Sequence, residues 1–91
     1  MDKLSVIKFS ATWCHPCKML APRFKEIVAE YSDSINVKEI DVDDDDEGLT
    51  NKFNIHSVPT ILILDGDTVL TRIVGNDPGK LEQELRLRIN H

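Results

Sequence analysis

The sequence contains little cysteine, no long apolar run and no excess of positive charge. Two cysteines occur among 91 residues, without a second Cys-x-x-Cys pair or a His-x3-His pair, so the common four-ligand zinc frameworks are absent. No apolar stretch is long enough to cross a bilayer, and charge interrupts residues 1–8, so we expect neither a membrane span nor a signal peptide. The formal net charge of −5 opposes binding to nucleic-acid phosphates. We therefore expect a cytoplasmic protein with no membrane or nucleic-acid partner.

The chain length predicts one domain. With 91 residues, 41% of them apolar, the sequence can bury a single modest core and has little room for a second site. We expect one domain over residues 1–91, acting as a monomer. In a reducing compartment its cysteine pair is more often catalytic or metal-binding than a structural crosslink.

The apolar pattern alternates between strands and helices. The predicted strands span residues 4–10, 34–42, 60–64 and 68–74, and the predicted helices span 15–31, 44–54 and the segment after Asp77. A long helix joins the first two strands, so they must run parallel, whereas Asp65-Gly66-Asp67 predicts an antiparallel hairpin between the last two. These elements predict an α/β fold in the order βαβ-ββα, with a four-stranded mixed sheet and three main helices.

The two cysteines lie where the first strand gives way to an amphipathic helix. Cys14 falls at the first turn of that helix, where unpaired backbone N–H groups and the helix dipole favour a thiolate over a thiol. We therefore assign Cys14 as the reactive nucleophile. Cys17, one helical turn later, is near enough to attack a mixed disulfide on Cys14 and release the partner in reduced form. The spacing predicts a dithiol–disulfide pair that transfers two electrons.

Several segments together resemble the thioredoxin family. The resemblance covers nearly the whole chain and rests on residues 9–19 (FSATWCHPCKM), on Asp41-Val42-Asp43, on Val58-Pro59-Thr60 and on Gly75. It implies a thioredoxin fold and the enzymatic reduction of disulfides in protein substrates, with Cys14 attacking and Cys17 resolving. It further implies no tightly bound cofactor, and regeneration by an external electron donor, either a flavin-dependent thioredoxin reductase or glutathione.

The resemblance also implies a shallow substrate groove beside the cysteines. In this family the proline of the Val-Pro-Thr segment is cis and faces the pair, so Pro59 should be cis and Val58 should offer backbone hydrogen bonds to an extended peptide. The implied contact residues are Trp13, His15, Pro16, Val58, Pro59 and Gly75. For Trp13 the alternative is a plain core aromatic, although its place beside the nucleophile favours the groove rim.

Two departures from the family pattern concern the N-terminus and the residue after Cys14. The sequence as given starts at the strand before the cysteines, without the family's usual additional strand and helix, so we expect a short core closer in outline to glutaredoxins with one exposed sheet edge. His15 stands where glycine is common, and its imidazole can stabilise the Cys14 thiolate and raise the reduction potential. The helix dipole opposes this effect, and the alternative is a solvated loop histidine without redox influence.

A third departure concerns charge beneath the cysteine pair. Lys8 takes the position of the family's buried aspartate, and Glu39 matches a nearby position often held by lysine. Strand parity puts both residues on one face of adjacent strands, so we predict a charge-reversed catalytic pair. A charged Lys8 would favour the Cys17 thiolate, whereas a neutral Lys8 would act as its base. The alternative is that Lys8 only extends to water through the open edge.

Other functions either fail on the sequence or stay open. A zinc site on Cys14, Cys17 and a histidine lacks a closing ligand, so no metal is expected. The acidic run over residues 41–47 lacks the glycine and glutamate of a calcium loop, and instead fits capping of the next helix. Glutaredoxin-like, oxidase or isomerase exchange stays open, as does a redox-independent role as a binding subunit.

Overall fold

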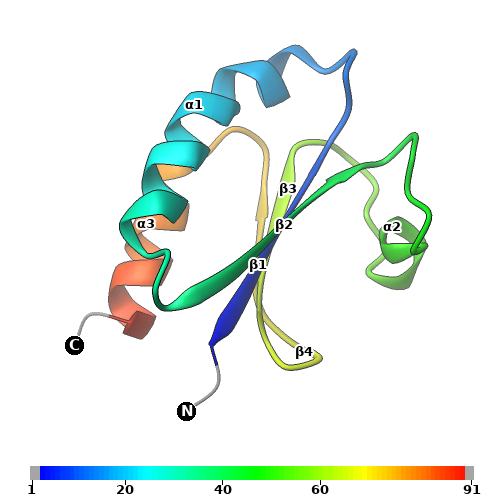
Figure 1. Cartoon of the computed structure of the whole chain (residues 1–91). Helices are drawn as coiled ribbons and strands as arrows, with labels where there is room; N and C mark the ends of the chain where they lie inside the picture. The colour runs from blue at the N-terminus through cyan, green and yellow to red at the C-terminus, as the bar shows by residue number, and fades with distance from the viewer. Residues whose placement is uncertain (1–2, 90–91) are drawn as a thin grey trace.

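A four-stranded sheet forms the centre of the protein (Figure 1), in a computed structural model that describes residues 3–89. The strands are β1 (Leu4–Ser10), β2 (Ile35–Asp41), β3 (Thr60–Asp65) and β4 (Thr68–Val74), in the spatial order β2-β1-β3-β4. β1 pairs with β2 in parallel, and β3 pairs antiparallel with both β1 and β4. The predicted mixed sheet is therefore confirmed. The first two and last two residues of the predicted domain lie outside the described residues.

Helices lie on both sides of this sheet. α1 (His15–Glu30) and α3 (Pro78–Ile89) lie side by side over one face, and α2 (Leu49–Lys52) lies on the other side (Figure 1). α1 makes the long crossover that parallel strands require. α3 begins as predicted, because Asp77 Oδ1 accepts the Lys80 N–H at 3.1 Å. No helix within residues 3–89 has the length and apolar content to cross a membrane.

Two apolar layers join the helices to the sheet. The layer under α1 and α3 buries side chains of both helices, namely Leu20, Phe24, Ile27, Leu81 and Leu85. The layer on the opposite face buries Ile7, Phe9 and Leu62, and Phe53 at the end of α2 packs against it. Each fully buried side chain of this size contributes roughly 1.5–3 kcal/mol to folding. β1 is thus covered on both faces, as its nearly continuous apolar run predicts.

The register of β1 against β2 brings two opposite charges together. Lys8 is the partner of Glu39, and Val6 is the partner of Val37. Because side chains two residues apart share a face, Lys8 follows Val6 onto the face that α1 covers. β2 forms one edge of the sheet, and its residues 36–39 are exposed. The predicted juxtaposition of Lys8 and Glu39 is therefore present in the backbone pairing.

The segment before α2 differs from the sequence prediction. The pattern predicts a helix over residues 44–54, but α2 spans only Leu49–Lys52, so the predicted length is wrong. Gly48 precedes the helix in the left-handed region at φ 69°, and Asp45 Oδ2 accepts the Thr50 N–H at 2.6 Å. Short acidic side chains that bond to nearby backbone favour turns over helix, which explains the shortening. The acidic run still supplies a cap, as predicted, through Asp45.

The Asp45 cap predicts a specific pH dependence of stability. Hydrogen bonding by the Thr50 side chain and backbone lowers the pKa of Asp45 below its ordinary 3.8. A carboxylate with a lowered pKa in the folded state stabilises the protein above its ordinary pKa, and that stabilisation is lost as pH falls through the folded value. Asp45→Ala should therefore lower the urea midpoint at pH 7 more than at pH 2.5. An equal loss at both pH values, or the same behaviour in the neighbouring control Asp46→Ala, would contradict this.

Candidate active site

The cysteine pair lies at the N-terminal end of α1. Cys14 is the N-cap residue, with φ −92° and ψ 107°, and its Sγ accepts the backbone N–H of Cys17 at 3.2 Å. The two sulfurs form a disulfide, and the two Cα atoms are 5.3 Å apart. The prediction that Cys14 and Cys17 lie close together is thus confirmed. Because an N-cap group faces unpaired backbone donors, a thiolate at Cys14 gains a hydrogen bond and a favourable dipole once the disulfide is reduced.

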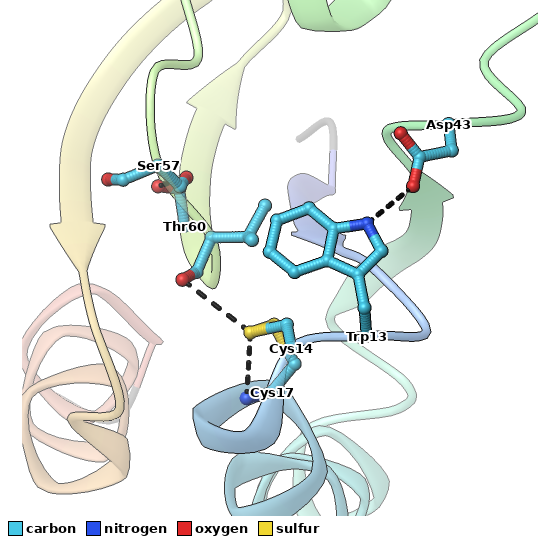
Figure 2. Close-up of a disulfide and its surroundings, with 7 residues drawn as sticks. Trp13, Cys14, Cys17, Asp43, Ser57 and Thr60 are labelled. Atoms are coloured by element: carbon cyan, nitrogen blue, oxygen red, sulfur yellow. Dashed lines mark hydrogen bonds between the residues drawn. A yellow bond between two sulfur atoms is a disulfide. The ribbon is translucent and has the colours of Figure 1, made fainter.

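A loop before β3 faces Cys14 across the site. Cys14 Sγ lies 3.6 Å from the carbonyl oxygen of Val58, and the peptide bond between Val58 and Pro59 is cis, as the resemblance implied. A hydrogen bond within the loop stabilises its conformation: the Thr60 hydroxyl donates to the Ser57 carbonyl at 2.8 Å. Figure 2 shows the cysteine sulfurs turned toward this segment. The disulfide is therefore flanked by the backbone of a loop that β3 anchors, in which Val58 is half-buried and Pro59 is buried.

Gly75 joins this loop to the end of β4. Its N–H donates to the Pro59 carbonyl at 2.8 Å, and its φ of 91° lies in the left-handed region that favours glycine. The preceding Val74 is one of the exposed large apolar side chains of the chain. The predicted contact residues Val58, Pro59 and Gly75 are therefore neighbours in space, although they come from two separate segments.

Trp13 forms the opposite rim of the site. Its side chain is 68% exposed, so the alternative of a plain core aromatic is wrong. The indole N–H donates to Asp43 Oδ2 at 2.7 Å (Figure 2), which ties the ring to the end of β2. Sequence reasoning misses Asp43 as a site residue, because its contact with Trp13 spans 30 residues and depends on how the strands are arranged. His15 and Pro16, in the first turn of α1, are exposed beside Trp13.

Lys8 lies behind the cysteine pair and is buried. It is 5% exposed, and its Nζ lies 2.9 Å from Glu39 Oε1 and 4.6 Å from the centre of the Phe24 ring. The alternative in which Lys8 only extends to water is wrong, since the side chain ends among protein atoms. Lys8 and Cys17 line the same shallow hollow of the surface. The structure thus brings Lys8, Glu39 and Cys17 into one neighbourhood, as the sequence predicted.

Metal binding has no site in the described part of the chain. Residues 3–89 hold no group of three or more His, Cys, Asp or Glu side chains placed to bind an ion. The acidic turn before α2 instead uses Asp41 and Asp45 to accept the backbone N–H groups of Asp43 and Thr50. These carboxylates organise the turn that supports Trp13.

A bonded Cys-x-x-Cys pair at the start of the first helix of this α/β fold defines a thiol–disulfide oxidoreductase. The family model for thioredoxin matches residues 1–87. The chain therefore belongs to the thioredoxin family.

Individual relatives agree with this assignment. Thioredoxin-2 of Saccharomyces cerevisiae is 39% identical over 84 residues, which cover 92% of this chain and 79% of that protein. Thioredoxin-T of Drosophila melanogaster is 44% identical over 80 residues, which cover 88% of this chain but only 50% of that protein. The crystal structure of thioredoxin from Trypanosoma brucei brucei matches with a TM-score of 0.89 and 31% identity, covering 99% of this chain and 78% of that one. The predicted thioredoxin fold is confirmed.

The geometry of the N-cap predicts which sulfur reacts first after reduction. Cys14 Sγ faces the Cys17 N–H, whereas Cys17 lies further into the helix. Iodoacetamide at neutral pH should therefore alkylate Cys14 before Cys17, because the thiolate is the nucleophile. Peptide mapping of protein alkylated for increasing times would measure the order. Equal labelling of the two cysteines, or earlier labelling of Cys17, would contradict the assignment.

Proposed function

We propose that this protein reduces disulfide bonds in other proteins. The observation that carries the proposal is the Cys14–Cys17 disulfide at the N-terminus of α1, with Cys14 Sγ 3.6 Å from the Val58 carbonyl. This arrangement puts the nucleophile beside the backbone of half-buried Val58, with which an extended substrate would pair. The thioredoxin relatives support the same reaction class.

The exchange proceeds in two steps that conserve electrons. The Cys14 thiolate attacks one sulfur of the substrate disulfide, a mixed disulfide forms, and the other substrate sulfur leaves as a thiolate that takes a proton from water. The Cys17 thiolate then attacks Cys14 Sγ, which breaks the mixed disulfide and releases the second substrate sulfur. The protein is oxidised by two electrons, and the substrate disulfide becomes two thiols. No tightly bound cofactor is required, because electrons pass from sulfur to sulfur.

The substrate peptide would lie between two rims. On one side the substrate would meet the backbone of Val58 and the neighbouring Gly75, and on the other the exposed ring of Trp13. His15 and Pro16 complete the contact surface beside Cys14. Backbone pairing and apolar contact select little by sequence, so the substrate range should be broad.

Regeneration requires a donor that reduces the Cys14–Cys17 disulfide. We propose a thioredoxin reductase in this role, with glutathione as the alternative, and a reducing compartment such as the cytoplasm as the place of action. We further propose that the protein works as a monomer. The bifunctional thioredoxin reductase/thioredoxin of Mycobacterium leprae, 39% identical over 74 residues of this chain, pairs the two activities in one polypeptide.

A substrate assay tests the proposed activity. The wild-type protein should accelerate the reduction of insulin disulfides by dithiothreitol, whereas Cys14→Ser should reduce the rate to that of dithiothreitol alone, because no mixed disulfide can form. Turbidity from the precipitating insulin chain measures the rate. Circular dichroism of both proteins serves as the control for folding.

Two results would overturn the proposal. Wild-type protein that accelerates nothing, although folded and fully reduced, would point to a redox-independent binding subunit. Acceleration that survives in Cys14→Ser would mean that the nucleophile is wrongly assigned. A surface variant, Ser57→Ala, should keep full activity, because Thr60 holds this loop through the Ser57 backbone carbonyl, which the substitution leaves in place.

The reduction potential separates a reductase from an oxidase or isomerase. Equilibration with glutathione, followed by Trp13 fluorescence, should give a value near the familiar thioredoxin example of about −270 mV rather than the roughly −120 to −180 mV of strong oxidants and isomerases. His15→Gly should make the potential more negative, because an imidazole beside Cys14 stabilises the reduced thiolate form. An unchanged potential in that variant would show that His15 is a solvated residue without redox influence.

A further inference from the structure

Lys8 is the one charged side chain that is buried among residues 3–89. Removing an unpaired ammonium from water is costly, so a protein keeps one in its interior only with a compensating partner. Glu39 supplies that partner at 2.9 Å, and the Phe24 ring supplies a second, weaker contact at 4.6 Å.

The two partners of this ion pair differ sharply in their exposure. The Lys8 side chain is 6% exposed, whereas the Glu39 side chain is 61% exposed. Water therefore screens the carboxylate much more than the ammonium, since an interaction through solvent is weaker than one through protein. On the buried side of the pair, the positive charge is therefore the less screened of the two.

That buried side borders the hollow that Cys17 lines. The charged groups on the hollow are Lys8 from β1, Lys18 from α1 and Asp41 from β2, and the facing loop over residues 57–60 contributes no titratable side chain. Lys18 is exposed and therefore screened by water. Asp41 ends the edge strand β2 and is only half-buried, so water screens its carboxylate as well. Of the three charged groups on this hollow, Lys8 is thus the buried and least screened one.

We propose that Lys8, held in place by Glu39, stabilises the Cys17 thiolate across this hollow and so accelerates the resolving step of exchange. The inference rests on the proposed disulfide reduction and assigns Lys8 and Glu39 as positioning residues for it. In the step concerned, Cys17 loses its proton to water, the thiolate attacks Cys14 Sγ, the Cys14–Cys17 bond forms and the substrate sulfur leaves with the electron pair. Lys8 remains an ammonium throughout and transfers no proton.

Stopped-flow reaction with 5,5′-dithiobis(2-nitrobenzoate) separates the two steps. Attack by Cys14 releases the first nitrothiobenzoate, and attack by Cys17 on the mixed disulfide releases the second. Lys8→Met should leave the first phase unchanged and slow the second about tenfold at pH 7, because a rise of one pKa unit lowers the thiolate fraction about tenfold. The loss should disappear as pH rises above the pKa of the Cys17 thiol.

Two control variants isolate the charge of Lys8. Lys38→Met removes the same charge at the residue before Glu39 in β2. Lys38 is exposed and donates to Glu47 at 2.7 Å, so this variant should leave both phases unchanged. Lys8→Arg keeps the charge and should restore the second phase. Circular dichroism and thermal unfolding verify that each variant is folded.

A titration tests the proposal without turnover. In Cys14→Ser, the 13Cβ chemical shift of Cys17 reports ionisation of its thiol, and adding Lys8→Met should raise that pKa by about one unit. Exchanging the pair, Lys8→Glu with Glu39→Lys, keeps an ion pair for stability but inverts the buried charge, so it should raise the pKa of Cys17 as well. This second variant stays informative if Lys8→Met fails to fold.

The outcomes distinguish this inference from the proposed function. An unchanged Cys17 titration in both the Lys8→Met and the exchanged variants would overturn the role of Lys8 while leaving disulfide reduction intact. A missing first phase in the wild-type protein would instead overturn the proposed function. A second phase that slows equally in Lys38→Met would show that overall charge, and not the buried ammonium, sets the rate.

Discussion

The hydrogen bond from the Cys17 N–H to Cys14 Sγ connects the fold to the chemistry. A helix must satisfy the backbone donors of its first turn, and here a sulfur atom does so where serine, threonine or aspartate usually serves. The same contact that begins α1 thereby stabilises negative charge on Cys14 after reduction. α1 can begin at this point because only a short loop, residues 11–14, separates it from β1, and apolar layers hold β1 on both faces. Stability of the sheet and reactivity of the sulfur are therefore linked through one short segment.

The second half of the site depends on long-range packing rather than on local sequence. The loop over residues 57–60 reaches Cys14 because β3 pairs antiparallel with β1, so the start of β3 lies beside the end of β1. Thr60 pairs with Phe9 in that register and also bonds back to Ser57. Gly75 adds a bond from the end of β4, the partner of β3 on its other side. The surroundings of Cys14 are thus made from three chain segments that the sheet register holds together.

Much of this arrangement could be predicted from the sequence, for identifiable reasons. β1 matches its predicted bounds because it is apolar on both faces, and β4 matches because a turn and Gly75 delimit it. The pairing of Lys8 with Glu39 follows from strand parity once β1 and β2 are known to be parallel. The resemblance identified the cis bond before Pro59, which residue patterns alone show only to be permitted.

The remaining features could not be predicted because they depend on competition between local and distant contacts. The acidic run has enough helix-compatible residues to suggest a longer α2, but Asp45 bonds to Thr50 and Gly48 adopts a positive φ, and both favour a turn. The bond between Trp13 and Asp43 spans 30 residues and needs the end of β2 to lie beside the loop after β1. Sequence spacing carries no signal for such a contact until the register is known.

The ion pair of Lys8 and Glu39 shows why residue identity alone does not define an electrostatic effect. If the two side chains were equally exposed, the electric fields of two opposite charges 2.9 Å apart would nearly cancel at a distant group. The edge position of β2 leaves Glu39 in water, whereas α1 covers Lys8 through Phe24, so the cancellation is incomplete toward the protein interior. The sign of the field at Cys17 is therefore a property of the fold. It depends on two structural facts: β2 forms the sheet edge, and α1 covers the face on which Lys8 lies. Knowing from the sequence that a lysine is paired with a glutamate reveals neither of them.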